Sequence, residues 1–205
     1  TAAVIVMDNS TDIIKAISML KKRGMAVGVQ LMIGLPSDTE ESLLQSTREV
    51  ARLTPAFARI YPLLVLEGSR MARWFQQGRY QPLSLETSIR LAAQMVTIFR
   101  HHSVRVIRMG LQAADGLTED QQVIAGPWHP AFGHLVLSEV LYRQVCRKVD
   151  AHLGHSANRI SGNTPAVIEI HVHPRSDCRL RGDKSANLNR LKERYKDLRL
   201  VVTHD

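Results

Sequence analysis

Apolar runs alternate with amphipathic helices along this chain, and that alternation most limits what it can fold into. Val27–Leu35 is apolar at almost every position, with Gln30 as the polar exception, and Ala58–Leu66 is a second such run. Strands of this kind are typical of parallel sheets, because helices cover both of their faces. The segments between the runs have helical periodicity and complete βα units. The pattern therefore predicts an α/β protein with a mainly parallel sheet.

Capping residues and periodicity place the other elements of this sheet and its helices. Ser37 and Glu40 match a capping box, which predicts a helix from there to about Leu53. Gly24 is a predicted helix stop, and Ser84 is a predicted cap. The further strands predicted are Val4–Met7 and Val104–Leu111, and the further helices are Asp12–Arg23, Met71–Gln76, Ser84–Phe99 and Leu135–Val149.

A change of pattern near residue 150 predicts a second domain. The segment Ala151–Thr164 is rich in Gly, Ser and Asn, which is typical of a linker. Beyond it, the strand 166–173 alternates apolar with polar residues, so one of its faces is polar. A basic helix from Ser185 and a strand Leu198–Thr203 complete a small βαβ unit. We therefore expect two domains, 1–150 and 151–205.

The basic charge of the chain is concentrated in its last third. The formal net charge is +8, and residues 143–199 carry 13 Lys/Arg against 6 Asp/Glu. Such a surface attracts polyanions, including RNA, although an ordinary solvated basic surface is the commoner origin of this composition. Both interpretations stay open at this point.

Other features of composition concern the environment of the protein. No apolar run is long enough to cross a membrane, so we expect no membrane partner. The two cysteines, Cys146 and Cys178, cannot form a disulfide framework, and a cytoplasmic location is the default. The chain starts at Thr1 within a strand-like run, and we expect that an upstream part has been removed. A parallel sheet without its first strands exposes an edge, through which the chain is expected to self-associate.

Several stretches follow one another in a familiar order. They are Gly28–Thr39, Ile60–Ser69 followed by Gly78–Ser84, Ile107–Gln112, Ala125–Gly133, and the tail around His171–Pro174 and Arg181–Asn189. Together they resemble the C-terminal half of radical S-adenosylmethionine (SAM) proteins, in the branch related to the Elongator catalytic subunit and to oxygen-independent coproporphyrinogen oxidase. The resemblance covers nearly all of residues 12–205. It implies a partial (βα) barrel of the radical SAM type, with only its later strands, followed by a small βαβ domain.

The resemblance also implies which residues contact SAM. Gln30, Met32 and Gly34 stand at the positions of the family's G-x-I-x-G pattern, which contacts the adenine, and Gln30 replaces its first glycine. Tyr61, with Glu67-Gly68 at the end of the next strand, is expected to complete that wall. Ligands of parallel barrels bind at the C-terminal ends of strands, where these residues lie. The alternative is that Gly34-Leu-Pro36 forms a tight strand-to-helix turn and nothing more.

The resemblance implies two cofactors, SAM and a [4Fe–4S] cluster. We expect both in the intact protein and neither in this chain alone. A [4Fe–4S] cluster of this kind needs three cysteine thiolates, with one iron left open for SAM. Cys146 and Cys178 are only two and stand 32 residues apart, in segments unrelated to the cluster loop. No catalytic residue is assigned.

Two groups of polar residues are candidates for binding a substrate or RNA. Arg108 and Gln112 follow a predicted strand, and His129 stands between two prolines, where it either meets a substrate or only satisfies loop backbone groups. Arg181 and Lys184 flank the start of the last helix, where backbone N–H groups favour anions.

Two histidines of the C-terminal domain are candidate metal ligands. His171 and His173 point the same way from one strand, but no convincing fourth ligand follows them, and we expect no metal there.

Two functions follow from these patterns. The first is a fragment of a radical SAM iron–sulfur enzyme that contributes SAM-adenine and substrate-side walls and acts on RNA. The second is a non-catalytic basic RNA- or protein-binding module. Charge reversal at Arg181, Lys184 and Arg190 is expected to weaken RNA binding by that module.

Overall fold

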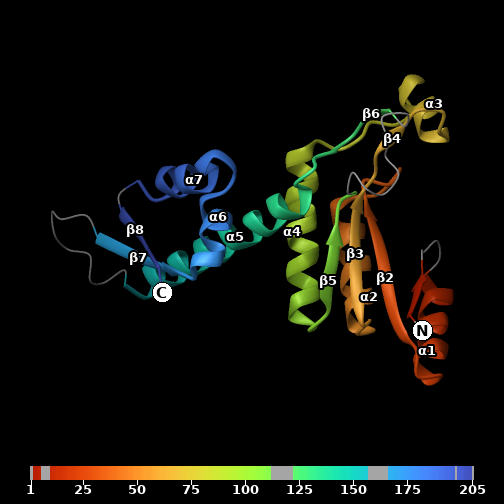
Figure 1. The fold of residues 1–205 in the computed structure, drawn as a ribbon, viewed down its shortest axis with the longest axis horizontal. Helices are drawn as coiled ribbons and strands as arrows, with labels where there is room; N and C mark the ends of the chain where they lie inside the picture. Colours follow the sequence, from red (N-terminus) through yellow and green to blue (C-terminus); the bar gives the residue numbers. More distant parts are fainter. Residues whose placement is uncertain (1, 6–9, 112–121, 157–165, 197, 205) are drawn as a thin grey trace. The chain divides into compact units, whose positions relative to one another are not determined.

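The computed structural model describes residues 2–5, 10–111, 122–156, 166–196 and 198–204. The chain divides into two compact units, Thr1–Gly133 and His134–Asp205 (Figure 1).

The first unit contains a four-stranded parallel sheet with the order β1-β2-β3-β5. Its strands are β1 (Ala2–Ile5), β2 (Ala26–Ile33), β3 (Phe57–Pro62) and β5 (Arg105–Met109). The connections carry α1 (Ser10–Lys22), α2 (Glu40–Arg52) and α4 (Leu85–His101). The parallel α/β organisation predicted from the alternation of apolar runs and helices is therefore confirmed.

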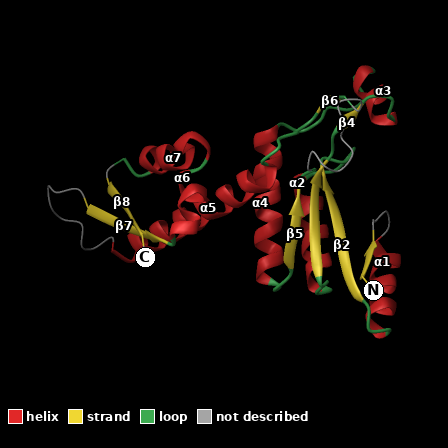
Figure 2. Ribbon diagram, viewed as in Figure 1, coloured by secondary structure: helices red, strands yellow, loops and turns green. Residues whose placement is uncertain are grey.

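The helices α2 and α4 pack against each other and against β2 and β3 (Figure 2). The strand residues under this helical layer are buried apolar side chains, namely Val27, Val29, Ile33, Ala58 and Ile60. Because successive strand residues point to opposite faces, Gln30, Met32, Arg59 and Tyr61 lie on the other face of the sheet. The polar exception in the β2 sequence is therefore explained by the two faces of the sheet.

The start of α2 differs from the prediction. Thr39, and not Ser37, caps this helix: its Oγ1 accepts a hydrogen bond from the Ser42 backbone N–H at 3.1 Å, and Ser42 Oγ accepts one from the Thr39 N–H at 3.0 Å. Ser37 has φ +68°, in the left-handed region. A cap residue normally has extended backbone, so Ser37 belongs to the preceding turn and the predicted Ser37–Glu40 capping box is wrong.

The apolar run Ala58–Leu66 forms two strands and not one. β3 ends at Pro62, which has no N–H to continue the ladder. The next strand, β4 (Val65–Leu66), pairs antiparallel with β6 (Val123–Ala125) in a separate small sheet. A short helix, α3 (Arg70–Gln76), follows, and Ser69 Oγ caps it by accepting from the Ala72 N–H at 3.0 Å.

The second unit joins a long helix to a two-stranded parallel sheet. Its main elements are α5 (Phe132–Ser156), β7 (Ala166–Val172), α7 (Ala186–Arg194) and β8 (Leu198–His204). Three short helical segments lie between β7 and α7, namely η1 (Pro174–Ser176), α6 (Asp177–Arg181) and η2 (Asp183–Ser185). The predicted alternation of β7 is present, because Val167, Glu169 and His171 are exposed and Val172 is buried.

The position of the unit boundary follows from α5. Val145, Cys146 and Val149 of this helix pack in one core with residues of α6 and α7, including Leu180 and Leu191. The expected division after residue 150 falls inside this continuous helix, whereas the units divide at residue 133. Within the described ranges, no helix is both long and apolar enough to span a membrane.

Candidate functional site

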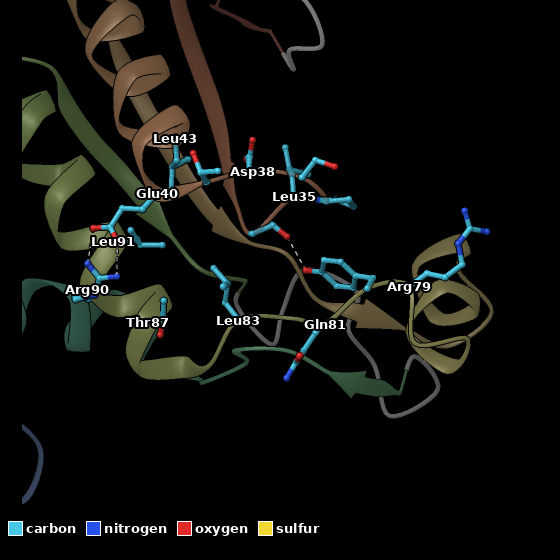
Figure 3. A pocket seen from close by; sticks show the side chains of 15 residues that line it. Leu35, Asp38, Glu40, Leu43, Arg79, Gln81, Leu83, Thr87, Arg90 and Leu91 are labelled. Atoms are coloured by element: carbon cyan, nitrogen blue, oxygen red, sulfur yellow. Dashed lines mark hydrogen bonds and ion pairs between the residues drawn. The ribbon is translucent and has the colours of Figure 1, made fainter.

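A cavity of about 490 Å³ lies at the C-terminal end of β2 (Figure 3). Its walls come from the turn after β2, the first turn of α2, the segment 79–83 and the first two turns of α4. Its volume is in the range of small-molecule sites. The lining mixes apolar side chains (Leu35, Leu43, Leu83, Leu91) with polar ones (Asp38, Thr39, Tyr80, Thr87).

Gly34 forms the floor of this cavity in a conformation that only glycine adopts easily. Its φ is +85°, and a Cβ built on it would lie 3.2 Å from Leu83 Cδ1. The Tyr80 hydroxyl donates to the Gly34 carbonyl at 2.7 Å. Burial raises the pKa of Tyr80, so its phenol keeps the proton that it donates. The turn after β2 is therefore fixed by the segment 79–83.

A bidentate ion pair closes one end of the cavity. Arg90 Nη1 and Nη2 donate to the two Glu40 oxygens at 2.6 and 2.7 Å, and Gln94 Nε2 donates to Glu40 Oε1 at 3.0 Å. Arg79 lies at the opposite end and packs over the Trp74 ring, 5.4 Å from its centroid. Burial also raises the pKa of the Asp38 carboxyl in the turn between them. The Glu40–Arg90 pair joins α2 to α4 and neutralises the charge at that end.

A row of polar side chains crosses the sheet on the face away from α2 and α4. Gln30 of β2 pairs in register with Arg59 of β3, and Arg59 pairs with Arg108 of β5. One step further along the strands, Met32 lies beside Tyr61. Paired residues of neighbouring strands share a face, so these side chains form one surface. The structure thus brings together Gln30, Met32, Tyr61 and Arg108 of the residues predicted from the sequence.

Other predicted residues of the first unit lie elsewhere. Gly34 lines the cavity, while Glu67 and Gly68 are exposed in the turn between β4 and α3. His129 Nδ1 accepts the Ala131 N–H at 3.0 Å, so its ring holds the loop before α5. Gln112 lies outside the described residues.

The predicted residues of the second unit are at its surface. Arg181 Nε pairs with Asp177 at 2.7 Å, and Lys184 is exposed with φ +46°. Among the residues that the structure describes, no group of three His, Cys, Asp or Glu side chains is placed to hold a metal. The His173 ring accepts the Arg175 N–H at 3.1 Å and so caps the turn that follows β7.

The sequence did not single out Arg59 or Tyr80 as site residues. Arg59 had a signal, because it is the one charged residue of an otherwise apolar run, and Gln30 is likewise the one polar residue of the previous strand. Tyr80 had none, because its partner Gly34 is 46 residues away. Contacts between distant segments of this kind leave no local pattern.

Several known proteins are similar to part of this chain. Residues 55–141 match the model of the radical SAM C-terminal domain. The chain is similar to the tRNA uridine(34) acetyltransferase of Dehalococcoides mccartyi, with 30% identity over 102 residues, 48% of this chain and 22% of that protein. It is also similar to the tRNA uridine(34) acetyltransferase of Methanocaldococcus jannaschii, with 33% identity over 90 residues, 42% of this chain and 17% of that protein.

The fold is similar to that of a solved structure. It is that of Methanocaldococcus infernus Elp3 with an N-terminal deletion, with a TM-score of 0.55, 22% identity, and coverage of 67% of this chain and 32% of that chain. The similarity to the first three curated relatives spans only 27%, 22% and 17% of their lengths.

Proposed function

We propose that this chain, a radical SAM protein of the branch related to the Elongator catalytic subunit, forms the adenine side and the substrate side of a SAM site that acts on RNA. In this proposal the parallel sheet is the later part of a partial (βα) barrel. The single observation that carries it is the polar row on one face of the sheet, in a chain whose residues 55–141 match a radical SAM C-terminal domain. The similar tRNA uridine(34) acetyltransferases favour an RNA substrate.

The adenine side is assigned to Gln30, Met32 and Tyr61, with Gly34 ending the strand. Gln30 and Met32 are half-buried, and Met32 lies in register with Tyr61. A carboxamide that both donates and accepts, next to apolar and aromatic groups, suits an adenine ring. Glu67 and Gly68 are assigned to the rim. These residues fit the nucleoside part of SAM.

The iron–sulfur cluster does not fit this chain. Both cysteines belong to the second unit, where Cys146 is buried and Cys178 is exposed. In this proposal, a cluster held by residues outside this chain would supply the radical chemistry of SAM. The residues of this chain bind and orient SAM and the substrate and exclude water.

The substrate side is assigned to Arg108, with His129 and Gln112 from the segments that follow it. Arg108 lies in the same row as Gln30, separated from it by Arg59 alone. The cationic part of the sheet face therefore borders the adenine side.

The test uses the open reading frame that encodes this chain, expressed anaerobically and reconstituted with iron and sulfide. We expect 5′-deoxyadenosine from the unchanged protein. Met32→Lys places a cation on the adenine wall and should weaken SAM binding at least tenfold while the iron content stays unchanged. Met19→Lys is the matched control, because Met19 is 54% exposed on α1. A cluster-loaded protein that makes no 5′-deoxyadenosine would contradict the enzyme assignment.

That negative result would favour the second candidate, a basic RNA- or protein-binding module. Its supporting observation is the exposure of Arg175, Arg179 and Lys184 in the second unit. Arg190 is unsuitable for a charge-reversal test, because it donates to Glu139 at 2.8 Å and lies 3.8 Å from the centroid of the Tyr142 ring. Its reversal would disturb packing between α5 and α7 as well as any bound RNA.

A further inference from the structure

We infer that Arg59 and Arg108 bind a phosphodiester group of RNA, next to Gln30, on the sheet face away from α2 and α4. This inference rests on the proposed RNA substrate and adds the residues that hold its backbone. It also assigns a role to Arg59. Neither the family resemblance nor the similar proteins assign a role to this residue.

The first argument is the register of the strands. Arg59 and Arg108 are direct cross-strand partners, and neighbouring strands lie about 4.8 Å apart. Two guanidinium groups at this spacing can contact the oxygens of one phosphate group.

The second argument is the environment of Arg59. Its Nε is buried and has no hydrogen-bond partner among the residues that the structure describes. A buried donor without a partner destabilises the fold, and an acceptor that reaches it recovers that loss. The Arg59 side chain is therefore poised for a ligand oxygen.

The third argument is that the Arg59 side chain packs against an aromatic ring. Its guanidinium lies 5.9 Å from the centroid of the Phe57 ring. Phe57 in turn covers Gly28 so closely that a Cβ there would lie 2.1 Å from Phe57 Cε2. A side chain held over an aromatic ring loses less freedom when it binds.

The charges on this face favour a phosphodiester over the amino-acid part of SAM. A planar guanidinium forms two parallel hydrogen bonds with phosphate oxygens. The exposed Arg105, which pairs with Phe57 in the next row, adds a third cation. SAM carries an ammonium and a sulfonium next to its carboxylate, and both would be repelled here. The phosphate groups of RNA are attracted by these cations.

The experiment measures binding of the 205-residue chain to a fluorescent single-stranded oligouridylate at several salt concentrations. The slope of log K against log salt should decrease in magnitude by about 0.7 for each lost phosphate contact. We expect this change for Arg59→Gln and for Arg108→Gln. Arg48→Gln, on the exposed side of α2, removes the same charge from the helical layer and should leave the slope unchanged. Arg59→Lys should keep the slope but bind more weakly, because it cannot form the bidentate contact.

Each other outcome has a defined meaning. Equal slopes for the unchanged chain and all four variants would overturn the phosphate site and leave the proposed function standing. Equal losses for Arg48→Gln and Arg59→Gln would also overturn it, because the effect would then be one of net charge. No binding to RNA at low salt would contradict the RNA substrate and, with it, this site. If Arg59→Gln weakens SAM binding but not RNA binding, the row holds SAM and the inference is wrong. Circular dichroism spectra that match the unchanged chain establish that each variant is folded.

Discussion

At the scale of single residues, the turn after β2 depends on one hydrogen bond between distant segments. The Tyr80 hydroxyl donates to the Gly34 carbonyl at 2.7 Å, and Tyr80 is 9% exposed. Gly34 supplies the positive φ, and Leu83 fills the space where a side chain would be. The turn after β2 and the segment 79–83 therefore form this wall of the cavity together.

Tyr80→Phe should destabilise the first unit by about 1 kcal/mol, because a buried carbonyl loses its donor and the ring is kept. Denaturant unfolding followed by tryptophan fluorescence measures this change. Tyr61→Phe is the matched control, since Tyr61 is equally buried on the sheet face but has no hydrogen bond described for its hydroxyl. Equal effects of the two substitutions would contradict the role of the Tyr80–Gly34 bond.

At the scale of elements, the start of α2 combines a turn with a capping box. Ser37 takes a left-handed conformation, and Thr39, two residues later, has φ −104° and ψ 162°. Thr39 and Ser42 exchange hydrogen bonds between side chain and backbone. Glu40 is thereby the first helical residue and faces Arg90 of α4.

Thr39→Ala should destabilise the first unit by about 1 kcal/mol, whereas Ser37→Ala should change its stability by a few tenths at most. The reason is that only Thr39 satisfies a free N–H of the first turn. Thermal unfolding of both variants measures the difference. A larger loss for Ser37→Ala would restore the capping box predicted from the sequence.

The elements that the sequence predicts best are those whose signals are local. Val27–Leu35 is a nearly continuous apolar run and the helix after Ser84 has clear helical periodicity, and both occur nearly as predicted. The run Ala58–Leu66 was predicted as one strand because hydrophobicity alone does not show where pairing changes partner. The change occurs at Pro62, and β4 then pairs with β6, some 60 residues later. The candidate site follows the same rule. Gln30 can be recognised in the sequence as the polar residue of an apolar run, whereas the register that pairs Arg59 with Arg108 joins two distant strands and leaves no local pattern.

At the scale of the whole molecule, the chain holds two units with separate cores. The second unit depends on Asn187, which is 5% exposed. Its Nδ2 donates to the Ser138 carbonyl at 3.1 Å, to Ser138 Oγ at 3.0 Å and to the Arg179 carbonyl at 3.3 Å. One amide thus joins α5, α6 and α7.

Asn187→Ala should destabilise the second unit by about 1–3 kcal/mol, because it removes a buried amide that donates to Ser138 Oγ and to two backbone carbonyls. The exposed Asn189→Ala in the same helix is the control. Both tryptophans, Trp74 and Trp128, belong to the first unit, so fluorescence follows that unit alone. We expect the circular dichroism transition to shift in Asn187→Ala while the fluorescence transition stays in place. A shift of both signals would show that the two units unfold together.

The buried, unpartnered Nε of Arg59 has a consequence for engineering this protein. A search for stabilising substitutions would select against Arg59, since an apolar residue of similar length removes an unsatisfied buried donor. The variants that survive heating best would then be those that have lost the proposed anion site. If that proposal holds, thermostability and RNA recognition are opposed at this position, and a screen for stability alone would remove RNA binding without any sign of damage to the fold.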